Sequence, residues 1–138
     1  MSLTVKYIII SFLLVFSVSS LWSQNFIDLD EPGVRELMKS SYPQFKQDRN
    51  VVNDAYEYLK FIDKITEQTI LFFMSDEGKC TYVRWISDYS NLNDMLALLN
   101  RNYKKTGNNS WTYSERNQNY IINLEEGEWY FTVSFRKK

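Results

Sequence analysis

The chain has 138 residues with 16 basic and 17 acidic side chains, one cysteine and no histidine. The absence of histidine removes the most frequent general base and the commonest metal ligand, and a single cysteine cannot form an internal disulfide. We therefore expect no zinc or transition-metal site and no cofactor. Nucleic acid is also excluded as an expected partner, because the only basic run, Arg136 to Lys138, is interpreted as a solvated tail.

Residues 1–24 have the layout of a secretory signal peptide. A single cation, Lys6, precedes an apolar run over residues 7–18, and small or polar residues follow. This run suffices for the hydrophobic part of a signal but is shorter than the roughly 20 residues that cross a bilayer. The weaker alternatives are an uncleaved anchor and a buried N-terminal helix. The pattern predicts an exported, periplasmic or extracellular protein whose mature part begins near Asn25 and keeps no membrane span.

Residues 25–138 are long enough for one domain with one core and too short for two. Residues 32–41 are predicted to form a helix that begins after Asp30 or Glu31 and buries one stripe, Val34, Leu37 and Met38. Residues 44–50 are polar and are predicted to be a connection. Three β-rich runs follow at 54–63, 69–75 and 79–87, and Cys80 is expected to be a buried strand residue. The last two runs flank Asp76-Glu77-Gly78, the strongest hairpin signal in the chain.

A second helix is predicted in SNLNDMLALLNRNYKK, residues 90–105. Ser90 or Asn91 can cap it, and Lys104 and Lys105 are placed at its C-terminal end, where the helix dipole favours cations. Its apolar residues recur at i, i+3, i+4, i+7 and i+11, a stripe that indicates a helix lying on a sheet. They are Leu92, Met95, Leu96, Leu99 and Tyr103.

Three further strands are predicted at residues 110–115, 119–124 and 128–136. Glu125-Glu126-Gly127 joins the last two as Asp76-Glu77-Gly78 joined the earlier pair. The expected fold is a single α+β domain with a mostly antiparallel sheet of about six strands and two helices packed on one face. The order helix, three strands, helix, three strands raises a weak internal repeat as a hypothesis. Two unrelated hairpins with common turn chemistry are the alternative.

Three polar motifs favour local structure over a site. The stretch IDLDEPG resembles the start of an EF-hand loop but has Pro32 at a ligand position, so helix capping fits it better. Glu125, Glu126 and Glu128 surround a tight turn, where an acid pair for glycoside hydrolysis would be solvated. The glycosylation sequon Asn108-Asn109-Ser110 is interpreted as a polar turn.

Aromatic residues make up 17% of the chain and are the one feature that favours a binding surface. In GEWYFTVSF, residues 127–135, the row Trp129, Phe131, Val133 and Phe135 alternates with Tyr130, Thr132 and Ser134. We predict that the first row is core and that a ligand, if any, contacts the other parity. The predicted partner-facing residues are Tyr113, Tyr120, Tyr130 and Thr132.

These patterns predict a small non-catalytic binding or accessory module for an extracytoplasmic protein or carbohydrate. A carboxylate-based hydrolase of an envelope polymer and a structural or assembly subunit are the alternatives. The general pattern is similar to many small exported bacterial proteins, and tandem helix-plus-strands modules also occur in secreted inhibitor proteins. Such a likeness in fold constrains function little.

Overall fold

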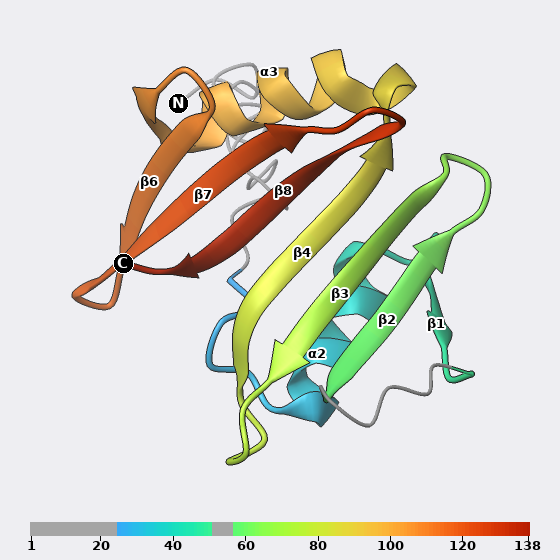
Figure 1. Ribbon diagram of the computed structural model, residues 1–138. Coiled ribbons are helices and arrows are strands. Elements are labelled where there is room, and N and C mark those ends of the chain that lie inside the picture. The colour runs from blue at the N-terminus through green and yellow to red at the C-terminus, as the bar shows by residue number, and fades with distance from the viewer. Residues whose placement is uncertain (1–24, 51–56) are drawn as a thin grey trace, which may run out of the picture.

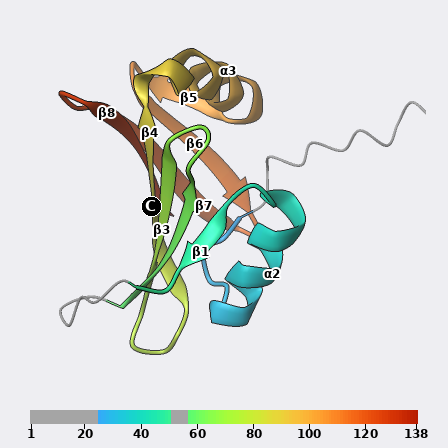
Figure 2. The same ribbon diagram turned by 90° about the vertical axis from the view of Figure 1, so that its right-hand side faces the viewer.

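The computed structural model describes residues 25–50 and 57–138, so the predicted signal peptide lies outside the described residues. They form an eight-stranded antiparallel sheet with the strand order β1-β2-β3-β4-β8-β7-β6-β5 (Figure 1). Both helices lie on the same side of this sheet, which Figure 2 shows edge-on. The helices are α2 (Glu31–Ser41) and α3 (Leu92–Asn102). The strands are β1 (Lys46–Asp48), β2 (Tyr58–Asp63), β3 (Gln68–Met74), β4 (Cys80–Asp88), β5 (Lys104–Gly107), β6 (Ser110–Glu115), β7 (Gln118–Glu126) and β8 (Tyr130–Lys137).

The α+β class is confirmed, but each helix is followed by four strands rather than three. The two strands that were not predicted, β1 and β5, are the two edges of the sheet. All four residues of β5 are exposed and none of β1 is buried, so neither strand has the alternation of apolar and polar residues that marks a strand in a sequence. The predicted sequence repeat stays a hypothesis, although the order of elements occurs twice.

Helix α2 begins where the sequence predicts. The Asp30 side chain accepts a hydrogen bond from the Gly33 backbone N–H at 2.9 Å, and a proline follows in the first turn. Val34 and Met38 are buried against the sheet. The predicted cap is therefore confirmed, and so is the predicted stripe for Val34 and Met38, whereas Leu37 is half-buried.

Helix α3 ends earlier than predicted, because Tyr103 has extended backbone angles. Lys104 and Lys105 consequently lie in the edge strand β5, and the prediction that they end the helix is wrong. Lysine on an edge strand discourages pairing with another chain. Asn91 occupies the N-cap position, but its side-chain amide donates to Thr66 O at 2.9 Å and does not cap the helix.

The two four-stranded halves meet where β4 pairs with β8. Trp85 lies opposite Val133, and Ser87 lies opposite Phe131, with these side chains directed toward the helices. Phe131 and Val133 are fully buried, which confirms their predicted place in the core. Trp129 is 76% exposed, so its predicted place in the core is wrong. The reason is that β8 begins at Tyr130, which leaves Trp129 in the turn.

The core is aromatic, and its polar atoms are paired. The fully buried Trp111 donates from Nε1 to Oδ1 of Asn100 on α3 at 2.9 Å, and Trp85 donates from Nε1 to Gln68 Oε1 at 2.8 Å. In the described part of the chain, every buried side-chain nitrogen and oxygen has a hydrogen-bond partner. No helix among residues 25–50 and 57–138 has the length and apolar content that crossing a membrane requires.

The chain before α2 is joined to the start of β4. The Asp28 N–H donates to Cys80 O, and the Cys80 N–H donates to Leu29 O, each at 2.8 Å. Cys80 is buried, as predicted, and burial raises the pKa of its thiol to about 12. Its thiol is therefore neutral at physiological pH.

Candidate binding surface

The sheet face that the helices leave uncovered, here called the free face, is turned toward the viewer in Figure 1. Along each strand the side chains of this face alternate with the buried ones, so the burial pattern and the strand registers together show which residues belong to it. A face wholly in water is usually polar, yet this one carries seven half-buried apolar or aromatic residues. They are Tyr58, Ile62, Leu71, Phe73, Tyr82, Ile86 and Ile121.

Three of these residues form a row across β2, β3 and β4, here called the aromatic ladder. Tyr58 lies opposite Phe73, and Phe73 lies opposite Tyr82. The ring centroids of successive members are 5.6 and 5.5 Å apart, with the ring planes tilted by 45° and 56°. Phe73, the middle ring, is flanked on both sides, whereas Tyr58 and Tyr82 are each flanked by one ring of the row.

The ladder continues into a basic region on the two central strands. Arg136 of β8 lies opposite Tyr82, and Arg84 of β4 lies opposite Ser134. Both arginines are exposed. Arg136 and Lys137 thus belong to a paired strand, so their interpretation as a solvated tail is wrong. Lys137 also forms an ion pair with Asp28 at 2.7 Å.

The β7–β8 turn borders the free face at its other end. Figure 2 shows this turn leaning away from the side that carries the helices. Gly127 donates its N–H to Tyr130 O at 2.9 Å, and the Tyr89 hydroxyl donates to Gly127 O. Around the turn lies a shallow hollow whose lining includes Arg84, Glu125, Glu128, Trp129, Tyr130 and Thr132.

The four predicted partner-facing residues do not share a surface. Tyr130 is 47% exposed on the free face, while Thr132, on the same face, is 9% exposed. Tyr113 and Tyr120 lie on the helix-covered face, where their rings stack with centroids 4.7 Å apart and planes 11° apart. The four residues therefore form two separate pairs, and only Tyr130 and Thr132 lie on the free face, at the hollow around the β7–β8 turn.

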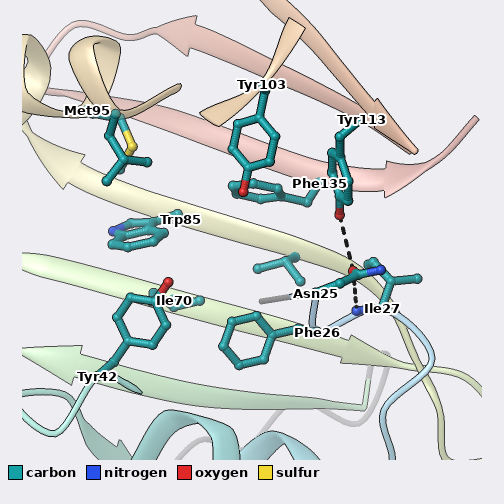
Figure 3. Close-up of a pocket in the computed structure, with 12 residues that line it drawn as sticks. Asn25, Phe26, Ile27, Tyr42, Ile70, Trp85, Met95, Tyr103, Tyr113 and Phe135 are labelled. Atoms are coloured by element: carbon teal, nitrogen blue, oxygen red, sulfur yellow. Dashed lines mark hydrogen bonds between the residues drawn. The ribbon is translucent and has the colours of Figure 1, made fainter. Parts of the chain in front are cut away.

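A cavity of about 40 Å³ lies on the helix-covered face of the sheet, between α2 and α3 (Figure 3). Tyr42 and Tyr103 point toward it from opposite sides. The Tyr113 hydroxyl donates to Asn25 Oδ1 at 3.1 Å, and the same oxygen accepts the Ile27 N–H at 3.0 Å. Asn25 thereby attaches the first described residues to the core.

Burial controls the acid–base state of the cavity. It raises the pKa of Tyr103 to about 12 and raises the pKa of Tyr42 and Tyr113 further. All three phenols are neutral at physiological pH and act as hydrogen-bonding groups. The volume admits a few water molecules but no drug-sized ligand.

The described residues contain no group of three or more histidine, cysteine or carboxylate side chains placed to hold a metal ion. Glu125, Glu126 and Glu128 are exposed around the β7–β8 turn. The free face thus presents its apolar rings and charged residues on an open surface rather than in a closed pocket.

Only part of the free face could be predicted from the sequence. Tyr58 and Tyr82 have the parity opposite to the buried Leu59 and Val83, and this alternation was the available signal. The lateral alignment of Tyr58, Phe73 and Tyr82 depends on the strand registers. The chain matches no protein-family model, no curated protein and no solved structure.

Proposed function

We propose that this protein is an exported, non-catalytic binding module that docks a partner protein on the free face of its sheet. The observation that carries the proposal is the half-buried apolar surface on a face that the described helices leave uncovered. Apolar residues on a face that the protein's own elements do not cover are typical of sites of interaction, and here they alternate with Lys60, Arg84 and Arg136. Tyrosine and arginine, which frame it here, are enriched among the residues that dominate binding energy.

The size of the face supports a protein partner. Eight strands about 4.8 Å apart, with about 20 Å of each strand presented, give a face of roughly 700 Å². A specific protein interface of standard size buries about 800 Å² on each partner. The free face and the adjoining β7–β8 turn together reach that area.

The ring geometry favours a protein over a carbohydrate. Sugars stack on flat, open aromatic faces, whereas the ladder rings are tilted by 45° and 56° and cover one another. Side chains of a partner protein can pack between tilted rings, as they do in a core. A carbohydrate partner remains the alternative, supported by the exposed indole of Trp129.

Site-specific photocrosslinking tests the proposal. We would place p-benzoylphenylalanine at Tyr82 in the ladder and, as the matched control, at Asn93, an exposed residue of α3. The cell-envelope fraction and the culture supernatant of the source organism supply the partners. We expect a discrete protein adduct at position 82 that position 93 does not give.

Two results would contradict the proposal. Equal adducts at both positions would mean that the free face is not selective, and the absence of any adduct at position 82 would remove it as the docking face. Export has its own measurement, N-terminal sequencing of the native protein. A chain that begins near Asn25 supports export, and one that begins at Met1 contradicts it.

A further inference from the structure

We infer that the partner presents carboxylate groups to the arginine pair, Arg84 and Arg136, in the middle of the free face. This inference rests on the proposed protein-binding function and specifies its chemistry. The two residues lie on adjacent strands, with Arg84 opposite Ser134 and Arg136 two residues further along β8. Side chains that are diagonal neighbours across two strands are within reach of each other when they are as long as arginine.

The arginine pair has no ionic partner in the described part of the chain. The ion pairs there are Arg35 with Glu31, Lys60 with Asp48 at 3.6 Å, and Lys137 with Asp28 at 2.7 Å. Arg136 makes one weak contact, from Nη1 to Lys137 O at 3.4 Å. Two neighbouring like charges are therefore left without a counter-charge, which destabilises them relative to a carboxylate-bound state.

The acidic residues of the same face do not pair with Arg84 or Arg136. Asp48 pairs with Lys60, and Asp88 accepts the Ser90 N–H at 2.9 Å, a contact that holds the pKa of Asp88 below its usual range. Glu125, Glu126 and Glu128 line the hollow that also includes Arg84, but none of them forms an ion pair with it. The centre of the face is thus basic, and its acids lie at its ends.

The apolar surroundings strengthen the attraction for a carboxylate. Tyr82 lies opposite Arg136, and Leu71 lies opposite Arg84 on the other side, so a docked partner would exclude water from the guanidinium groups. A guanidinium binds a carboxylate through two parallel hydrogen bonds, and the interaction is stronger where water is excluded. A second copy of this chain fits less well, because a two-fold contact between free faces would bring the same arginines together.

The first measurement uses an acidic peptide as the probe. The ¹⁵N-labelled full chain is titrated with acetylated, amidated hexaglutamate, with hexaglutamine as the neutral control, and the arginine Nε–Hε signals are followed by NMR. We expect saturable shifts at Arg84 and Arg136 with hexaglutamate alone. Arg101 and Arg116, exposed residues on α3 and in the β6–β7 turn, serve as internal controls and should shift little.

Matched double variants complete the test. Arg84→Gln with Arg136→Gln should weaken hexaglutamate binding at least about tenfold, whereas Arg101→Gln with Arg116→Gln should leave it unchanged. Equal shifts at all four arginines, or equal affinity of both double variants, would overturn the inference. The inference would also be overturned if light scattering showed a dimer of the unmodified chain and a monomer of the Arg84→Gln, Arg136→Gln variant, because the occupant of the free face would then be a second copy.

The same variants separate this inference from the proposed function. If the adduct at position 82 persists in Arg84→Gln, Arg136→Gln with undiminished yield, the free face binds a protein but the carboxylate chemistry is wrong. If the adduct is lost in that variant and retained in Arg101→Gln, Arg116→Gln, both statements are supported. If position 82 gives no adduct in the unmodified chain, the proposed function itself fails.

Discussion

Replacing Trp111 and Trp129 separately by phenylalanine tests whether Trp111 is buried and whether Trp129 lies outside β8. Trp111 is fully buried and donates from Nε1 to Asn100 Oδ1, whereas Trp129 is 76% exposed in the β7–β8 turn. The same chemical change is therefore made at an interior and an exterior site. Trp111→Phe leaves a cavity and removes a hydrogen bond, while Trp129→Phe removes neither packing nor a polar contact in the core.

The expected magnitudes follow from these environments. The smaller ring at position 111 loses about 1 kcal/mol of apolar burial, about 1 kcal/mol for the hydrogen bond, and a further contribution from the cavity. We expect Trp111→Phe to lower the free energy of unfolding by about 2–3 kcal/mol. Trp129→Phe should change it by less than about 0.5 kcal/mol, as exposed substitutions do.

Urea denaturation followed by circular dichroism measures both values. With a slope of about 2 kcal/mol per molar urea, Trp111→Phe should lower the midpoint by about 1 M or more, and Trp129→Phe should leave it within about 0.3 M. Comparable losses in the two variants would contradict the position of Trp129 outside β8. A strand that began at residue 129 would turn its ring to the same face as the buried Phe131 and Val133.

Three further outcomes are expected. Cys80, buried with a raised pKa of about 12, should react with iodoacetamide at pH 8 at least about 1,000-fold more slowly in the native protein than in urea; comparable rates would contradict its burial. Asp63→Ala should lower the free energy of unfolding by about 1–3 kcal/mol, because Asp63 accepts hydrogen bonds from the Ile65 and Thr66 backbone and from the Thr66 hydroxyl at 2.6 Å. These bonds lower the pKa of Asp63, so their stabilisation is present above pH about 4 and is lost as the pH falls through the folded-state pKa; acid titration of both proteins should show the difference shrinking. Gly127→Ala should lower the melting temperature by several degrees, because its Cβ would lie 2.8 Å from Tyr130 O, whereas Gly107→Ala, with its nearest atom at 3.7 Å, should change it little; equal effects would place the strain elsewhere.

The helices and inner strands could be predicted because burial imposes a period on their residues. Val34 and Met38 recur at helical spacing, and Phe131 and Val133 at strand spacing. The edge strands could not be predicted. In β5 the residues of both parities are exposed, so the strand has no alternation of apolar and polar residues. Trp129 continues the alternation of β8 in the sequence, but it lies one residue before Tyr130, the first residue of β8 that pairs. No local property of the sequence marks that boundary.

The candidate surface depended on information that is not local. The choice of Tyr130 and Thr132 followed from alternation alone and gave the correct side of β8. Tyr113 and Tyr120 were grouped with them because tyrosine tolerates partly exposed positions. Their packing against the core, which includes a ring contact between Tyr113 and Tyr103, places them on the helix-covered side of the sheet. The ladder and the arginine pair arise from registers between strands, which separate segments of sequence do not encode individually.

The place of β8 also has a consequence for when the protein can fold. This strand is the last in chain order, yet it lies between β4 and β7 in the middle of the sheet. Without it, β1 to β4 and β5 to β7 can form only two incomplete sheets, each with an unpaired inner edge. The two parts are joined only when residues 130–137 pair with β4, as Arg136 does with Tyr82, a contact between distant parts of the chain. Contacts of this range slow folding. A chain that ends before Tyr130 should therefore be protease-sensitive, and the chain with β8 should fold as a unit.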